Sequence, residues 1–140
     1  MSALRLLLVD DSPAERELAG EAIAEFAPDL ELTTVGGRDE LLAWLANEPL
    51  PDLLLIDLHL GPDRGSAIAA ELRDHPAQAV PLVILTTTED AVERANCLSA
   101  GAHDFWIKPL HFADYPLLIE RARALAGQRR SATFACIRPG

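Results

Sequence analysis

Aspartate residues follow two short apolar segments of the chain. Asp10 and Asp11 come directly after residues 6–9, and Asp57 comes directly after residues 53–56. Three carboxylates brought together repel one another, and a hard cation such as Mg²⁺, which prefers oxygen ligands and often lies between carboxylates and a phosphate, relieves that repulsion. A carboxylate also attacks phosphorus to form an acyl phosphate. These residues predict a Mg²⁺ site formed by Asp10, Asp11 and Asp57, with Asp57 as the phosphoryl acceptor.

Each aspartate also has a simpler explanation. Asp11 or Ser12 could cap a helix, with Glu15 completing an arrangement like a capping box. Asp57 taken alone is more often a turn residue at the end of a strand. Only the expected convergence of the aspartates favours the chemical interpretation.

Lys108 is the only lysine among the 12 basic residues of the chain. This bias indicates a position that needs an ammonium group, a compact charge suited to a phosphate at short range. Pro109 predicts a fixed turn after it, for which a cis peptide bond is one option. Thr86 follows the apolar segment 82–85, and its hydroxyl could donate to a phosphoryl oxygen, although taken alone it is better explained as a capping residue.

The hydrophobic pattern predicts the elements that position these side chains. The purely apolar runs are typical of strands buried on both faces of a parallel sheet, and helical stripes lie between them. We expect strands at residues 6–9, 31–35, 53–56, 82–85 and 103–107. Five strands alternating with five helices predict an α/β, doubly wound, flavodoxin-like sheet of strand order 2-1-3-4-5, which binds ligands beyond the carboxyl ends of its first and third strands.

Composition limits the classes of partner. The formal net charge of −10 argues against a nucleic-acid or membrane binder, because both partners are anionic. The apolar start of the chain is too short for a signal peptide, and two distant cysteines do not form a disulfide framework. We therefore expect a soluble, cytoplasmic protein.

The C-terminal segment, residues 127–140, is too short for a second domain. Residues 132–137 alternate loosely between apolar and polar types and include Phe134 and Ile137. Two interpretations remain open: an arm that adds a strand to a second protomer and so forms a homodimer, or a frayed terminus.

The acidic pair after the first strand, the aspartate after the third, the threonine after the fourth and the Lys-Pro pair after the fifth resemble the receiver domain of two-component response regulators. The resemblance covers residues 3–126, and we interpret residues 1–126 as one receiver domain followed by the tail. It implies phosphorylation by a sensor histidine kinase, a metal site and a switch. The implied metal ligands are Asp10, Asp11, Asp57 and the backbone carbonyl of His59; the implied phosphoryl-reading residues are Thr86 and Lys108, and the implied aromatic switch is Phe105.

The same resemblance implies how the signal would leave the domain. Phosphorylation would change the surface of the fourth helix, fifth strand and fifth helix, and the domain would act on a downstream protein or a phosphotransfer protein, as a single-domain regulator, a phosphorelay intermediate or a phosphate sink. The threonine run and the short tail also resemble regulators that serve phytochrome-type kinases. One departure is Gly61, which stands where the family usually has proline, with Pro62 displaced by one position.

Two other functions use related chemistry. A haloacid-dehalogenase-like phosphatase also has an aspartyl nucleophile and Mg²⁺, but it needs a second acid where this chain has His59. A flavin or nucleotide carrier of the same topology needs a phosphate-binding loop after the first strand, where Asp10 and Asp11 would repel the ligand.

Overall fold

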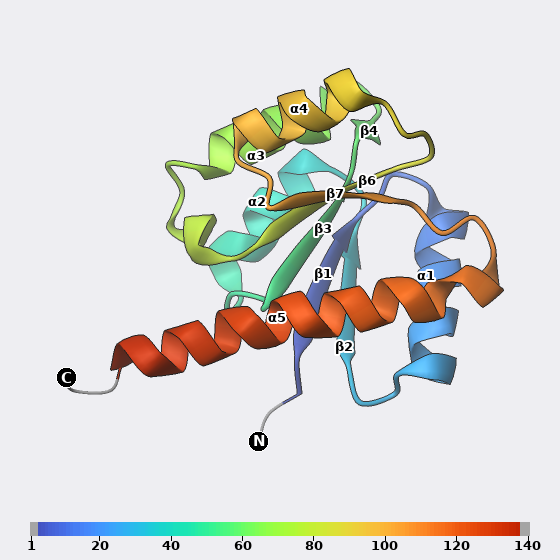
Figure 1. Cartoon of the computed structure of the whole chain (residues 1–140), viewed down its shortest axis with the longest axis horizontal. Helices are drawn as coiled ribbons and strands as arrows, with labels where there is room; N and C mark the ends of the chain where they lie inside the picture. Colours follow the sequence, from blue (N-terminus) through green and yellow to red (C-terminus); the bar gives the residue numbers. More distant parts are fainter. Residues whose placement is uncertain (1–2, 138–140) are drawn as a thin grey trace.

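A five-stranded parallel sheet forms the centre of the molecule (Figure 1). The structure is a computed structural model, which describes the backbone of residues 3–137 and the side chains of residues 3–129. Its strands pair in the order β2-β1-β3-β6-β7, which confirms the predicted order 2-1-3-4-5. The strands are β1 (Arg5–Val9), β2 (Glu31–Val35), β3 (Leu53–Asp57), β6 (Leu82–Thr86) and β7 (Asp104–Ile107).

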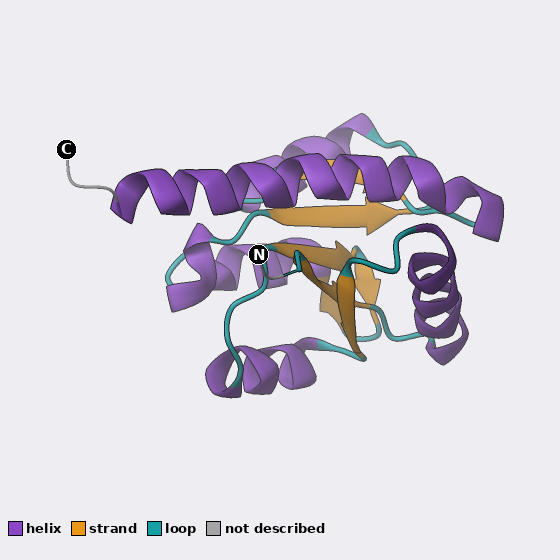
Figure 2. Cartoon of the chain, turned by 90° about the horizontal axis from the view of Figure 1, so that it is seen from below, coloured by secondary structure: helices purple, strands orange, loops and turns teal. Residues whose placement is uncertain are grey.

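Helices cover both faces of this sheet (Figure 2). The helices are α1 (Pro13–Phe26), α2 (Arg38–Asn47), α3 (Gly65–Leu72), α4 (Ala91–Ala100) and α5 (Tyr115–Ile137), with short 3₁₀ turns at Pro76–Ala79 (η1) and Phe112–Asp114 (η2). Successive strand residues point to opposite faces, so Leu7 packs under α2, α3 and α4, whereas Leu6 and Leu8 pack under α1 and α5. Burial on both faces explains why the central strands are almost entirely leucine, isoleucine and valine.

A small hairpin that the sequence pattern did not predict follows β3. It pairs β4 (His59–Leu60) with β5 (Asp63–Arg64), so Gly61 and Pro62 form the two-residue turn between them. Gly61 has a φ of 63°, a conformation that side chains disfavour and that a type II′ turn requires at its first central position. The unusual Gly61-Pro62 order therefore matches the conformation of this turn.

Residues 132–137, for which an added strand was one of two interpretations, belong to α5, which continues to Ile137 as one helix of 23 residues. Gly127 lies inside this helix, and a single glycine weakens a helix without ending it. The side chains of Phe134 and Ile137 lie outside the described part of the structure, so the dimer arm stays a prediction. Across residues 3–137, no helix combines the length and the apolar character needed to cross a membrane.

Candidate functional site

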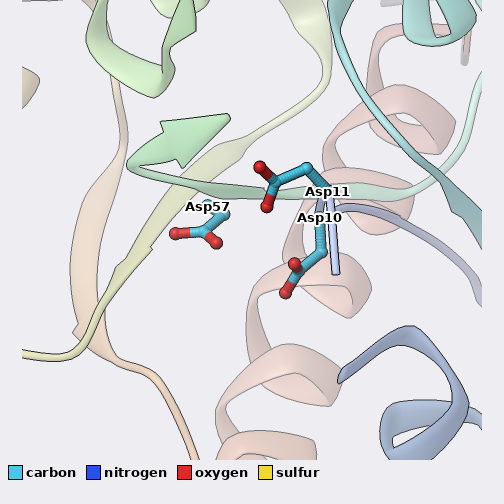
Figure 3. Close-up of side chains that lie close together, drawn as sticks. All are labelled: Asp10, Asp11 and Asp57. Atoms are coloured by element: carbon cyan, nitrogen blue, oxygen red, sulfur yellow. The ribbon is translucent and has the colours of Figure 1, made fainter. Parts of the chain in front are cut away.

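The three aspartates meet at the carboxyl edge of the sheet (Figure 3). Asp57 is the last residue of β3, and Asp10 and Asp11 directly follow β1. The register that aligns Val9 with Ile56 brings the two strand ends side by side. Carboxylate oxygens of all three residues lie within 4.8 Å of one another. The structure thus confirms the predicted convergence, with Asp10 and Asp57 buried and Asp11 exposed.

Lys108 supplies the positive charge at this cluster. It follows β7, and its ammonium group lies 2.7 Å from Asp10 Oδ2 and 3.0 Å from Asp57 Oδ2. It also forms a short hydrogen bond with Glu15 of α1. Burial alone would lower the pKa of Lys108, but its contacts with the carboxylates of Asp10, Glu15 and Asp57 outweigh burial and raise that pKa above its ordinary value. Lys108 is therefore held as a cation among carboxylates.

The donor set fits a hard divalent cation. Asp10 Oδ2 is buried and accepts no well-directed hydrogen bond from the described residues, so its contact with Lys108 is an ion pair only. Asp57 Oδ1 accepts a hydrogen bond from the backbone N–H of His59 at 3.3 Å, which places the turn after β3 beside the cluster. Three carboxylates and one ammonium leave an excess of negative charge, and oxygen donors of this kind suit Mg²⁺. The cluster can therefore hold a cation.

The residues expected to respond to a phosphoryl group lie on β6 and β7, the two strands beyond β3 in the sheet. Thr86 is the last residue of β6, which pairs with β3 so that Leu85 is aligned with Asp57. Its hydroxyl oxygen accepts a 3.4 Å hydrogen bond from the backbone N–H of Thr88. Phe105 of β7 is buried in the core beneath α3 and α4. Thr86 thus lies next to the cluster, whereas Phe105 already points inward.

Some details of the site differ from the sequence expectations. The Lys108–Pro109 peptide bond is trans, so the cis option is wrong. Ser12 caps α1 by accepting from the backbone N–H of Glu15, but the Glu15 carboxylate binds Lys108, which excludes the expected capping-box role for this side chain. Arg16 was also missed: it donates to the backbone carbonyl of Asp10 at 2.6 Å and so holds the loop after β1.

Gly65 is a further position that the site requires. A Cβ atom there would lie 2.7 Å from the carbonyl oxygen of Asp57 and 3.2 Å from Cα of Leu58. The first residue of α3 therefore packs directly against the backbone that carries Asp57. The sequence indicates this contact only through the position of Gly65 relative to Asp57 along the chain.

The family model of the response regulator receiver domain matches residues 6–120, which include every residue of the cluster. The chain belongs to this family. Receiver domains accept a phosphoryl group on an aspartate, as the phosphoacceptor modules of two-component signalling. In this chain the acidic cluster and Lys108 lie together at the carboxyl edge of the sheet.

Individual relatives agree with this assignment. The response regulator PleD of Caulobacter vibrioides is 34% identical over 127 residues, covering 89% of this chain and 26% of PleD. A putative response regulator from Chloroflexus aurantiacus has a TM-score of 0.75 at 25% identity, covering 89% of this chain and 98% of that one. The phosphorylated cyanobacterial phytochrome response regulator RcpA has a TM-score of 0.74 at 25% identity, covering 86% and 91%. Among curated relatives, the chain thus spans about a quarter of PleD.

Proposed function

We propose that this receiver domain is switched by phosphorylation of Asp57, with the phosphoryl group supplied by a sensor histidine kinase. The observation that carries the proposal is the buried contact between Asp57 and Lys108 beside Asp10 and Asp11. A nucleophilic carboxylate, an ammonium for phosphoryl oxygens and a donor set for a cation are the parts that phosphoryl transfer to a carboxylate requires.

In the proposed reaction, a carboxylate oxygen of Asp57 attacks the phosphorus of a phosphohistidine. The new P–O bond forms as the P–N bond breaks, and the bonding electron pair leaves with the imidazole nitrogen. Lys108 then donates a hydrogen bond to a phosphoryl oxygen. Asp10, Asp11, Asp57 and the backbone carbonyl of His59 would hold Mg²⁺, which would offset the negative charge of the transferred group. Loss of phosphate by hydrolysis of the acyl phosphate resets Asp57.

We propose Thr86 and Phe105 as the residues that pass this change to the surface of α4, β7 and α5. The phosphoryl group carries roughly −1.5 to −2 charges beside Thr86, in place of the single charge of the Asp57 carboxylate, and draws the Thr86 hydroxyl away from Thr88. A movement of Thr86 changes the packing room beside Phe105 in the adjacent strand. The surface of α4, β7 and α5 would then bind a downstream protein, or the domain would pass its phosphate to a phosphotransfer protein or act as a phosphate sink.

The similarity to RcpA supports a phytochrome-like kinase as the partner, because RcpA is a phytochrome response regulator. A cytoplasmic location belongs to the same proposal. A turnover phosphatase is the weaker alternative, since the residue two positions after Asp57 is His59, which offers no second carboxylate.

The first prediction is that Asp57 alone carries the phosphoryl group. Wild-type protein mixed with Mg²⁺ and acetyl phosphate should gain a mass of roughly 80 Da, corresponding to one phosphoryl group. Asp57→Asn should lose the adduct, because an amide does not attack phosphorus. Asp63→Asn, an equal change in the adjacent hairpin, should keep it. An adduct that survives in Asp57→Asn, or sustained hydrolysis of phosphomonoesters, would contradict the proposal.

A further inference from the structure

Glu15 brings a fourth carboxylate to the aspartate cluster, from the first turn of α1. Its Oε2 atom accepts a hydrogen bond from Lys108 Nζ across 93 residues of sequence. The Glu15 side chain is 39% exposed, whereas those of Asp10 and Asp57 are 1% and 13% exposed. Glu15 is therefore the partner of Lys108 that can move into water at the smallest cost.

The ammonium group of Lys108 has three N–H donors and three carboxylate neighbours. Lys108 also borders a small cavity of about 20 Å³, which is lined mainly by apolar side chains, including Leu55, Leu85 and Tyr115. That side of Lys108 offers mostly apolar atoms as neighbours. Two of the carboxylates, those of Glu15 and Asp57, accept hydrogen bonds from the ammonium, so a phosphoryl oxygen that reaches Lys108 competes with them for its N–H donors.

The two aspartates are held in place by other bonds. Asp10 Oδ1 accepts from the backbone N–H of Ser12 at 2.9 Å, and Asp57 Oδ1 accepts from that of His59 at 3.3 Å. Within the described residues, the Glu15 carboxylate is bound through Lys108 alone. Glu15 also lies outside the group of carboxylates that could share a cation.

We propose that Glu15 is a positioning residue that occupies one N–H of Lys108 in the unphosphorylated protein and yields it to a phosphoryl oxygen when Asp57 is phosphorylated. This inference rests on the proposed function. Glu15 then slows phosphorylation in two ways: it engages the ammonium that must meet the donor, and it adds negative charge where an anionic donor approaches. The contact is a built-in control on the rate at which Asp57 accepts phosphate.

The second prediction tests this contact with acetyl phosphate and Mg²⁺. In that reaction an Asp57 oxygen attacks phosphorus, the P–O bond to acetate breaks, and the bonding electrons leave with acetate. Glu15→Gln removes the charge but keeps the shape and the helix-forming tendency of the side chain. We expect it to speed formation of the adduct by about threefold to tenfold, as loss of one partly exposed opposing charge allows. Glu17→Gln makes the same change on an exposed position of α1 and should match wild type.

Because Lys108 is the only lysine, protein labelled with ¹³C- and ¹⁵N-lysine gives a single lysine Nζ signal in NMR spectra. In the unphosphorylated protein this signal should shift in Glu15→Gln and stay unchanged in Glu17→Gln, a response that a purely structural role of Glu15 would not produce. An unshifted Lys108 signal, or equal phosphorylation rates for the two variants, would overturn this inference and leave the proposed function standing. Absence of any adduct in wild type would overturn the proposed function and this inference with it.

Discussion

Lys108 is the residue on which the electrostatics of the site depend. One buried ammonium faces Asp10, Glu15 and Asp57, and Asp11 lies within the same cluster. An ammonium group is a compact point charge that can serve carboxylates in several directions, whereas a planar guanidinium presents its donors in one fork. This geometry explains why position 108 holds a lysine in a chain whose other cationic side chains are arginines.

The third prediction concerns removal of this charge. Lys108→Met keeps the apolar stem but leaves the carboxylates without their counter-charge. Breaking a buried ion pair should lower the free energy of unfolding by about 3 kcal/mol in a chelator. Added Mg²⁺ should restore stability and bind more tightly than to wild type, because the cluster is more negative. Urea unfolding with EDTA and with Mg²⁺ measures both effects; equal losses in the two conditions would show that the carboxylates do not share a cation.

The stability that Lys108 contributes has a defined pH range. Burial opposes its charge, but the contacts with Asp10, Glu15 and Asp57 raise its folded-state pKa above the ordinary 10.5. A raised lysine pKa stabilises the fold fully below 10.5, and this contribution is lost as the pH rises further. Between neutral pH and 10 the difference between wild type and Lys108→Met should therefore stay constant.

The sequence identified Lys108 but not the role of Glu15, for a physical reason. A lysine that occurs once stands out in the composition, and its place after the last strand is fixed by the apolar pattern. Glu15 stands three residues after Ser12, a spacing that equally predicts a local capping bond. Only the packing of α1 against the sheet decides that its carboxylate turns to Lys108, and packing between distant segments leaves no periodic signal.

At the scale of the elements, the start of α3 supports the end of β3. The backbone N–H of Gly65 donates to the carbonyl oxygen of Leu58 at 2.8 Å, which closes the β4–β5 hairpin beside Asp57. The hairpin also contacts α4, because Arg64 forms a 2.8 Å ion pair with Glu93. A shift of the Asp57 backbone would therefore be transmitted through these contacts to α3 and α4.

The fourth prediction tests this support. In Gly65→Ala the new methyl group would lie 2.7 Å from the Asp57 carbonyl oxygen, and backbone atoms cannot yield without distorting the strand end. We expect a loss of about 1–3 kcal/mol in unfolding free energy and slower phosphorylation of Asp57. Gly20→Ala, in open space on α1, should instead gain about 0.5–1 kcal/mol and leave the rate unchanged. Denaturant unfolding and adduct formation measure both; equal behaviour of the two variants would refute a supporting role for Gly65.

The sequence predicted the long elements better than the short ones. Runs such as Leu53–Ile56 identify strands because burial on both faces admits only apolar residues. The β4–β5 hairpin was missed because its strands have two residues each, too few for any periodicity. The full length of α5 was not predicted, because residues 132–137 alternate loosely between apolar and polar types, whereas the helix continues to Ile137.

Over the whole molecule, α5 ties the two ends of the sheet together. It begins with Tyr115 near the carboxyl edge of the sheet, where Lys108, Asp10 and Glu15 are nearby charges. Burial raises the pKa of Tyr115. It then runs along the sheet to the opposite edge (Figure 2), where Arg129 lies 3.5 Å from the buried carboxylate of Asp52. Asp52 Oδ2 also accepts from the backbone N–H at the start of β1 at 2.9 Å. The segment after residue 126 is thus a continuation of the domain's own packing as far as Arg129.

The fifth prediction is that Arg129 anchors this part of α5. Arg129→Met removes a cation that faces Asp52, a carboxylate that is 3% exposed, and should cost about 1–3 kcal/mol of stability. Hydrogen exchange should quicken in the turn of α5 that contains Arg129 before it changes near Tyr115. Arg123→Met loses the same charge from the same helix, but its partner Asp29 is exposed, so water replaces the lost bonds and the exchange near Arg129 should stay slow. If both variants exchange alike, α5 is held by its apolar face alone, and the ion pair with Asp52 adds nothing to the anchoring of its C-terminal half.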